Sequence, residues 1–342
     1  MKKCISKGKV TLRDIALKTG FSVNTVSHAI KGIDDVKPET KKVILEAAER
    51  LGYIPNLTAV SMRSGKTHTV AVIIPDISSL FFPIMVKMLE EELRKKGYTI
   101  IIMNTNENEE QEKECIIAAI AKSVDGVIIC PTQDSQKGLE LLKRHQIPFV
   151  LMGRSLFDGE YEAVLADDYR CGYIAADYLL KMGHRKILYL TVPLAVSSVA
   201  ERKAGYLMAM EKAGATVNEN LMRIWDKETA EDIADSIKSK KLDCTAIFAF
   251  NDMLAFEVAT LLLERGLRIP EDISLIGVDN IQSHMMLPLR LTTIEASKKH
   301  MVNNIIDSLM GMIQGTARIF SKHLLSPELI IRDTVKSLNK EL

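Results

Sequence analysis

The feature that most constrains the fold is a series of short apolar runs that starts at Thr69. Seven runs of six or seven residues alternate with stretches of helical periodicity, in the order TVAVIIP, YTIIIMN, VDGVIIC, IPFVLMG, KILYLT, TAIFAF and ISLIGV. Runs that are rich in Val, Ile and Leu and bounded by turn residues are typical of parallel strands covered on both faces by crossover helices. The sequence therefore predicts an α/β core made of two doubly wound halves.

The N-terminal residues follow a different pattern. Residues 11–32 read TLRDIALKTGFSVNTVSHAIKG, which is two short amphipathic segments separated by a turn at Gly20. Thr11 with Asp14, and later Ser22, are helix-start residues, and Gly20 favours the left-handed conformation that ends a helix. We interpret this stretch as a helix-turn-helix. On spacing alone, an ordinary helical hairpin with a polar face is an equal alternative.

A third amphipathic segment and an asymmetry of charge favour the helix-turn-helix. Pro38 opens a helical pattern that ends at Gly52, so three helices can close a small core. Residues 1–66 hold 13 Lys and Arg against 6 Asp and Glu, a net charge of +7, whereas the rest of the chain carries −6 and the whole chain +1. A small basic module joined to a larger acidic one is typical of a protein whose N-terminal part meets the phosphate backbone of DNA.

Other classes of function find little support in the sequence. The five cysteines lie far apart without a CxxC pair, which favours free thiols in a reducing cytoplasm, and we find neither a signal peptide nor a membrane-spanning stretch. The chain has no GxGxxG after the first run, no GxSxG and no metal-ligand cluster, and the GKT at residues 65–67 precedes a strand where a phosphate loop would follow one. We therefore expect a cytoplasmic protein that is not an enzyme and that has no metal, cofactor or membrane contact.

Over nearly its whole length the chain resembles the LacI/GalR family of transcriptional repressors. The segments that carry the resemblance occur in the family's order: VTLRDIA, FSVNTVSHAI, VKPETKKVILEAAERLGYIPN, SGKTHTVAVIIPDISSLFFP, NDMLAFEVA, RIPEDISLIGVDN, LTTI and LIIRD. The resemblance implies a small all-α helix-turn-helix head and an α/β core of two subdomains similar to periplasmic binding proteins. The implied boundaries are 1–53 for the head, 54–67 for a hinge helix, 68–166 with 296–322 for the core N-subdomain, and 167–295 with 323–342 for the core C-subdomain.

The resemblance assigns DNA contacts to the second helix and to the hinge. The implied residues are Thr11, Ser22, Val23, Asn24, Thr25, Ser27, His28, Asn56, Met62 and Arg63. Asn pairs with adenine, Ser and Thr reach bases or phosphates, and His28 can donate to guanine or to a phosphate. Met62 stands where the family usually has the leucine that wedges between base pairs. Residues 56–64 are too short to hold a helix alone, so we expect them to fold only against DNA.

An effector in the cleft between the two core subdomains is also implied by the resemblance. The implied ligand residues follow the predicted strands and are Asp76, Phe81, Phe82, Arg202, Asn251, Asp252 and Asp279. Carboxylates, amides and an arginine pair with hydroxyls or ring nitrogens, while aromatic faces stack on flat ligands, so a sugar, a sugar derivative or a heterocycle fits. For Phe81 and Asp252, a core aromatic and a helix cap are equally good explanations.

Some residues depart from the pattern of the family. Val196 and Ala166 replace an arginine and an acid of some relatives, Lys227 occupies the place of an aromatic wall, and Val60 replaces a common hinge arginine. A charged or otherwise unusual effector therefore stays open. Trp225, the only tryptophan, could border the pocket, but we interpret it as a core residue.

The leading hypothesis is an effector-responsive, homodimeric repressor that binds palindromic operator DNA and controls genes of carbohydrate or related small-molecule metabolism. The alternative is a solute-binding protein for transport or chemoreception, which would share the core but would need a signal peptide and have no use for the basic head. The C-terminal residues SLNKEL lack leucine heptads, so a dimer is the simpler expectation. The sequence leaves open whether a protein co-regulator binds the core.

Overall fold

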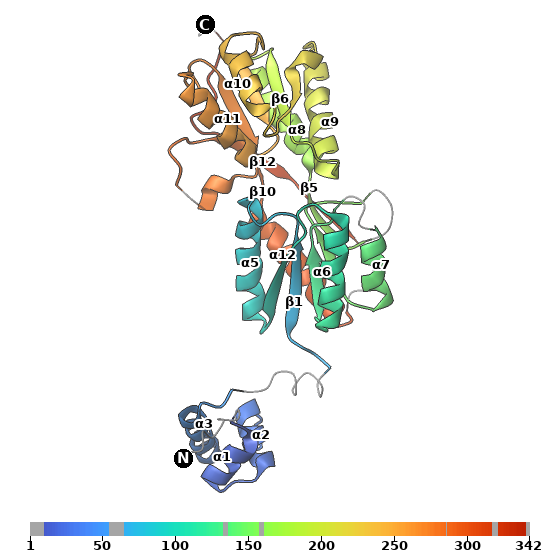
Figure 1. Cartoon of the computed structure of the whole chain (residues 1–342), viewed down its shortest axis with the longest axis vertical. Coiled ribbons are helices and arrows are strands. Elements are labelled where there is room, and N and C mark those ends of the chain that lie inside the picture. The colour runs from blue at the N-terminus through green and yellow to red at the C-terminus, as the bar shows by residue number, and fades with distance from the viewer. Residues whose placement is uncertain are drawn as a thin grey trace, which may run out of the picture. The chain divides into compact units, whose positions relative to one another are not determined.

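The computed structural model describes residues 10–54, 65–132, 136–156, 161–284, 286–316 and 321–339. The chain divides into two compact units, Met1–Thr67 and His68–Leu342 (Figure 1). The predicted hinge helix, with its proposed DNA contacts Asn56, Met62 and Arg63, lies outside the described residues. Within the described ranges, no helix has the length and apolar character that a membrane crossing requires.

The N-terminal unit is a three-helix head made of α1 (Leu12–Thr19), α2 (Val23–Lys31) and α3 (Pro38–Leu51). The predicted helix starts are present: the Thr11 amide donates to the Asp14 carboxylate (2.7 Å), and the Ser22 hydroxyl accepts from the Thr25 amide (3.1 Å). Gly20 ends α1 at a φ of +77°, where a side chain would be strained. The inward faces of all three helices form one apolar cluster, so the head has its own core.

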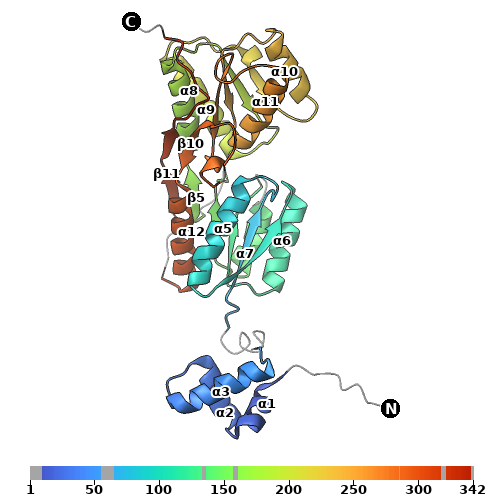
Figure 2. The same cartoon turned by 90° about the vertical axis from the view of Figure 1, so that its left-hand side faces the viewer.

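The first half of the core is a six-stranded parallel sheet in the order β11-β5-β4-β3-β1-β2. Its strands are β1 (Thr69–Ile74), β2 (Thr99–Asn104), β3 (Gly126–Ile129), β4 (Phe149–Met152), β5 (Ala163–Ala166) and β11 (Lys322–Leu325). Its helices are α5 (Phe81–Lys95), α6 (Glu109–Ala121), α7 (Gln136–Arg144) and α12 (Lys298–Ile313). Helices α5 and α12 cover one face and α6 and α7 the other, which buries the central strands on both sides (Figures 1 and 2).

The second half repeats this architecture in the order β12-β10-β9-β8-β6-β7, with only the β10–β12 pair antiparallel. Its strands are β6 (Ile187–Thr191), β7 (Met222–Ile224), β8 (Ala246–Ala249), β9 (Ser274–Val278), β10 (Thr292–Ala296) and β12 (Pro327–Ile330). Its helices are α8 (Asp168–Lys181), α9 (Ser197–Lys212), α10 (Ala230–Lys238) and α11 (Asp252–Glu264), with short 3-10 turns at Glu219–Leu221 and Ile281–His284. Helices α8 and α9 share one apolar cluster with the sheet, and α10 and α11 share another.

The chain passes between the halves three times. The passages lie between β5 and α8, between β10 and α12, and between β11 and β12. They are neighbours in space, because Leu325 pairs with Ala166 and Pro327 pairs with Ala296. The sequence predicts that the second segment of the core N-subdomain ends at residue 322. It ends three residues later, because β11 is hydrogen-bonded to β5 as far as Leu325. Likewise, Ala296 ends β10 and belongs to the C-subdomain.

Candidate functional sites

The outward face of α2 is the first candidate site. Val26 and Ala29 are buried against α1 and α3, which leaves the predicted contact residues Val23 and Asn24 exposed and Thr25, Ser27 and His28 half-buried. Thr11 and Ser22, predicted near phosphates, are exposed at the starts of α1 and α2. The Ser22 and Thr25 hydroxyls lie 2.8 Å apart, so both side chains are also engaged in capping the helix. The structure thus gathers the seven predicted head residues that it describes on accessible surface.

A cavity of about 890 Å³ in the core is the second candidate site. Its walls come from both halves, at the carboxyl ends of strands such as β1, β4, β8 and β9. This is the place at which doubly wound sheets bind ligands. Six of the seven predicted ligand residues line it: Asp76, Phe81, Phe82, Arg202, Asn251 and Asp279.

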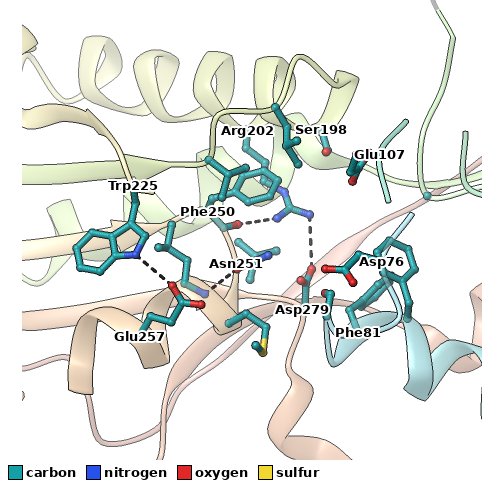
Figure 3. Close-up of a pocket in the computed structure, with 18 of the residues that line it drawn as sticks. Asp76, Phe81, Glu107, Ser198, Arg202, Trp225, Phe250, Asn251, Glu257 and Asp279 are labelled. Carbon is teal, nitrogen blue, oxygen red and sulfur yellow. Dashed lines mark hydrogen bonds and ion pairs between the residues drawn. The ribbon is translucent and has the colours of Figure 1, made fainter. Parts of the chain in front are cut away.

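Arg202 is the most constrained side chain of the cavity (Figure 3). Its guanidinium donates to Asp168 Oδ1 (2.7 Å) and to the Phe250 carbonyl (2.6 Å), and it lies 3.5 Å from Asp279 Oδ1. The same guanidinium lies over the Phe250 ring, 4.5 Å from the ring centre. The residue is only 7% exposed, so the two carboxylates compensate a charge that would otherwise be costly to bury.

The close packing of α8 on α9 places Arg202 beside Asp168. A Cβ atom on Gly172 would lie 2.0 Å from the Arg202 carbonyl oxygen, and one on Gly205 would lie 1.9 Å from the Tyr169 carbonyl oxygen. Because no side chain fits at either contact, glycine at these two positions lets the helix backbones approach each other. The approach aligns the Arg202 side chain with the first turn of α8, where Asp168 begins the helix.

Asp279 follows β9 and occupies an unusual backbone conformation. Its φ is +106°, a value that few residues other than glycine adopt. Burial raises the pKa of its carboxyl to about 6, while the charge of Arg202 acts in the opposite direction. The carboxyl of Asp279, which lines the cavity, therefore titrates close to neutral pH.

The N-subdomain supplies the opposite wall. Asp76 follows β1 and accepts from the amide (2.8 Å) and the hydroxyl (2.7 Å) of Ser78, and its carboxylate is directed toward that of Asp279 (Figure 3). The rings of Phe81 and Phe82 at the start of α5 meet edge to face at 5.4 Å. The structure therefore brings two acids from different halves of the core to one cavity.

An arginine–glutamate pair in this wall was missed by the sequence analysis. Arg154 follows β4 and donates to both carboxylate oxygens of Glu107, at 2.7 and 2.6 Å, and to the Pro131 carbonyl at 3.3 Å. Because Arg154 comes directly after the run IPFVLMG, its position indicates the carboxyl end of a strand, where the cavity lies. Its partner could not be identified, because Glu107 lies 47 residues earlier.

The assignment of Asp252 needs correction. Asp252 does not line the cavity: it is fully buried at the start of α11 and accepts from the Thr293 hydroxyl (2.5 Å) and the Ile281 amide (3.0 Å). The helix-end explanation is therefore the better one. Trp225 is buried in the core as predicted, but it also lines the cavity, and its indole N–H donates to Glu257 (3.1 Å).

Asn251 both caps a helix and lines the cavity. Its side-chain oxygen accepts from the Leu254 amide (2.9 Å) and so caps α11, while the residue also lines the cavity. Lys227, which departs from the family's pattern, is exposed and belongs to the same lining. Ala166 lines the cavity as well, at the end of β5.

A basic three-helix head and a two-lobed core with a polar cavity define a DNA-binding regulator that responds to a small ligand. Residues 11–56 match the bacterial regulatory proteins of the lacI family, and residues 67–332 match the periplasmic binding proteins and sugar binding domain of the LacI family. The chain belongs to the LacI family.

Relatives with curated names agree with this assignment. The HTH-type transcriptional repressor PurR of Vibrio vulnificus is 33% identical over 335 residues, which cover 96% of this chain and 99% of that protein. A LacI family transcriptional regulator from Enterococcus faecium with bound ribose is 28% identical, with a TM-score of 0.69 over 79% of this chain and all of that one. The lac repressor dimer bound to operator and the anti-inducer ONPF has the same fold, with a TM-score of 0.83 at 22% identity over 96% of this chain and all of that one.

The chain is thus an effector-responsive DNA-binding transcriptional regulator of the repressor type. The alternative of a solute-binding protein for transport or chemoreception is not favoured, because its relatives over the whole length, head included, are transcriptional repressors.

Proposed function

We propose that the effector is a neutral, hydroxyl-rich molecule of the sugar class, held between the two core subdomains, and that its binding changes the affinity of the head for an operator. The observation that carries the proposal is the pair of carboxylates, Asp76 and Asp279, that face each other from different subdomains (Figure 3). Two carboxylates on opposite walls accept hydrogen bonds, so one ligand with donors on two sides can bridge them. Sugar hydroxyls are donors of this kind.

The remaining charges of the cavity argue against an anionic effector. Among the described residues of its lining, six are acidic and three basic: Asp76, Glu107, Asp168, Asp226, Glu257 and Asp279 against Arg154, Arg202 and Lys227. Both arginines are already paired with carboxylates. A phosphorylated or carboxylated ligand would have to displace these pairs and would meet an excess of negative charge. The proposal is also supported by the 28% identical regulator whose structure contains ribose.

The aromatic side chains of the lining suit the apolar faces of a sugar ring. Phe81, Phe82 and Trp225 line the same cavity as the acids, so hydroxyls and ring carbons can be recognised by different walls. Because the volume of about 890 Å³ lies within the range of small-molecule sites, a monosaccharide or a disaccharide can be accommodated.

The proposed mode of DNA binding uses the outward face of α2. Its exposed Asn24 and half-buried His28 can reach base edges in a major groove, while Thr11 and Ser22 lie at helix starts, where amides and hydroxyls contact phosphates. We propose a homodimer on a palindromic operator, since the family contains a repressor solved as a dimer on its operator. Sedimentation of the protein with and without operator DNA tests this assembly. A monomer bound to a single half-site would contradict it.

Calorimetric titration of the full-length protein tests the effector class. The panel consists of neutral mono- and disaccharides, their phosphorylated or carboxylated counterparts, and purine and pyrimidine bases. We expect binding within the neutral sugars and little binding of the anionic sugars. Saturable binding of a base or of a sugar phosphate, with no neutral sugar bound, would overturn the proposal.

A matched pair of variants then assigns the site. Asp279→Asn removes a carboxylate that faces the cavity, and Asp252→Asn makes the same replacement at a buried acid that does not line it. We expect Asp279→Asn to abolish the response of operator binding to the sugar, and Asp252→Asn to preserve it. Operator affinity without the sugar should be close to wild type in both variants, because coupling requires a difference in ligand contact.

The pH dependence of effector binding provides an independent prediction. Because the pKa of Asp279 is raised to about 6, the carboxylate that accepts a sugar hydroxyl is lost as the pH falls through that value. Affinity should therefore be highest at neutral pH and about tenfold lower at pH 5, in proportion to the ionised fraction. The residual affinity of Asp279→Asn for the sugar should be the same at pH 5 and pH 7. Equal affinity of the wild type at pH 5 and pH 7 would remove Asp279 from the site.

A further inference from the structure

The loop between α2 and α3 places two acidic residues, Asp34 and Asp35, beside the proposed DNA-reading helix. The unit that contains them carries a net charge of +7, so acids at this edge oppose its attraction to phosphates. Asp35 nevertheless makes a specific contact with His28 on that helix. Its Oδ2 lies 2.6 Å from Nδ1 of His28, with the two side chains 53% and 30% exposed.

The contact determines which atom of the imidazole is available to DNA. A carboxylate only accepts hydrogen bonds, so Nδ1 of His28 must carry the proton that lies between the two groups. The other ring nitrogen, Nε2, is then the atom left to reach a base. In the neutral ring Nε2 would be an acceptor, whereas in the imidazolium it would be a donor.

These two states read different bases. A donor at Nε2 matches the N7 and O6 acceptors of guanine in the major groove, while an acceptor matches the amino groups of adenine or cytosine. The 2.6 Å distance between Asp35 Oδ2 and His28 Nδ1 is typical of a charge-assisted hydrogen bond, in which the imidazole carries a proton on both nitrogens and Nε2 is a donor. The hollow that His28 and Asp35 share is also lined by Lys37, and Lys31 lies on the same helix.

We propose that Asp35 is a positioning residue for DNA recognition, which holds His28 through Nδ1 so that Nε2–H of the imidazolium reads a guanine. The proposal rests on the proposed function of α2 as the reading helix. The same hollow is lined by Asn24 and Thr25, so the pair lies within the set of side chains assigned to base contacts. Asp35 thereby contributes to sequence specificity without contacting DNA itself.

The test compares four variants of the full-length protein on an operator selected from random DNA and on single-base changes of it. Asp35→Asn removes the counter-ion, Asp34→Asn removes the same charge one residue away, and His28→Gln and His28→Ala remove the imidazole. The readout is the specificity ratio, the affinity for the guanine-bearing operator divided by that for the operator with this base pair replaced. Thermal unfolding of each variant checks that the head remains folded.

We expect Asp35→Asn and His28→Ala each to lower the specificity ratio at one base pair by about tenfold, the scale of a lost base contact. Asp34→Asn should leave the ratio unchanged and strengthen binding to all sequences slightly, because it removes a negative charge near phosphates. His28→Gln should lower the ratio at the same base pair, because it removes the imidazole that Asp35 holds.

The outcomes separate the proposal from its premise. A ratio that is unchanged in both His28 variants would show that His28 does not read DNA at all, and the premise would fail. If the His28 variants lose specificity but Asp35→Asn behaves like Asp34→Asn, Asp35 is not a positioning residue. A ratio that depends on Asp35 but that favours adenine or cytosine at this base pair would show that Nε2 accepts, and would overturn the assignment to guanine.

Discussion

The two sites of the molecule use polar side chains in opposite ways. On α2 they are exposed or half-buried, and most are short, and Ser22, Thr25 and His28 are held by contacts within the head. In the core cavity, Arg202 and Arg154 are at most 8% exposed, and both are paired with carboxylates before any ligand binds. The head therefore presents exposed polar side chains to DNA. In the cavity, by contrast, the arginines already have carboxylate partners, and a ligand must bind beside these ion pairs.

This difference predicts where mutations will act. Truncating an exposed side chain of α2 removes a contact with DNA and leaves the protein intact. Truncating a member of the buried network leaves charged partners without compensation, so the free protein itself is destabilised. Binding and stability should thus be separable in the head and inseparable in the core.

The largest effect is expected for Arg202→Met. The change leaves Asp168 and Asp279 buried beside each other without their shared cation, which should lower the free energy of unfolding of the core by about 3–5 kcal/mol. Lys227→Met changes an exposed cation of the same lining and should have little effect. Denaturant titration measures both. If the free energies of unfolding of the two variants differ by less than about 1 kcal/mol, the buried network tolerates an unpaired acid. The contrast between core and head would then disappear.

Gly205→Ala should be the next most harmful change, and it tests how the network is positioned. Within a helix, Gly→Ala normally stabilises by about 1 kcal/mol. Here the new methyl group would lie 1.9 Å from the Tyr169 carbonyl, so α8 and α9 must separate, at a cost of about 1–3 kcal/mol. Gly138→Ala is the control, because its methyl group would meet the flexible end of the Ile116 side chain at 2.8 Å and the Glu112 carboxylate only at the ordinary contact distance of 3.8 Å. Equal stability of the two variants would show that α8 and α9 can move apart freely.

Asn24→Ala should affect operator binding alone. Loss of a bidentate base contact predicts about 1–3 kcal/mol on the preferred operator and little on random DNA. The free energy of unfolding should change by less than about 0.5 kcal/mol, since Asn24 is exposed. Electrophoretic or fluorescence titrations on both DNAs, beside denaturation, provide the comparison. An equal loss on both DNAs would make Asn24 a phosphate contact.

A prediction of a different kind is a slope of stability with pH that arises from Asp252. Burial raises its pKa from 3.8 to about 8, and the nearby charge of Asp279 acts in the same direction. Between these values the folded core holds a proton that the unfolded chain has released. Stability is therefore fully present below the lower value and falls as the pH rises, by up to about 1.4 kcal/mol per unit. Asp252→Asn, whose amide can donate to Thr293 and accept from Ile281, should flatten this slope. A slope unchanged by the variant would assign it to other groups.

The sequence predicts the architecture well because burial leaves a strong pattern. All seven apolar runs are strands, and most of their residues are buried between helices on both faces. Five further strands, β5, β7, β10, β11 and β12, were not recognised. Most of them are only three or four residues long, and β7, β11 and β12 are edge strands with partly exposed residues, so their apolar pattern is weak.

Prediction of the cavity was limited by side-chain direction. Asp252 and Asp279 both follow strands of one sheet, yet only Asp279 faces the cavity. Asp252 is turned against β9, where Gly277 leaves room: a Cβ atom there would lie 2.3 Å from its carboxylate. The pairing of Arg154 with Glu107 depends on the approach of two loops, which no local pattern records.

The three neighbouring passages between the core subdomains have a mechanical consequence. Two subdomains joined by a single connection can rotate relative to each other about three axes. When three connections lie side by side, the main rotation that remains is the one about the line through them. The passages at Ala166, Ala296 and Leu325 are linked to one another by strand pairing. Motion between the two core subdomains is then chiefly an opening and closing of the cleft, and an effector of the proposed kind, held by Asp76 and Asp279, would select one angle of opening. Such an effector would lose little orientational entropy of the subdomains on binding.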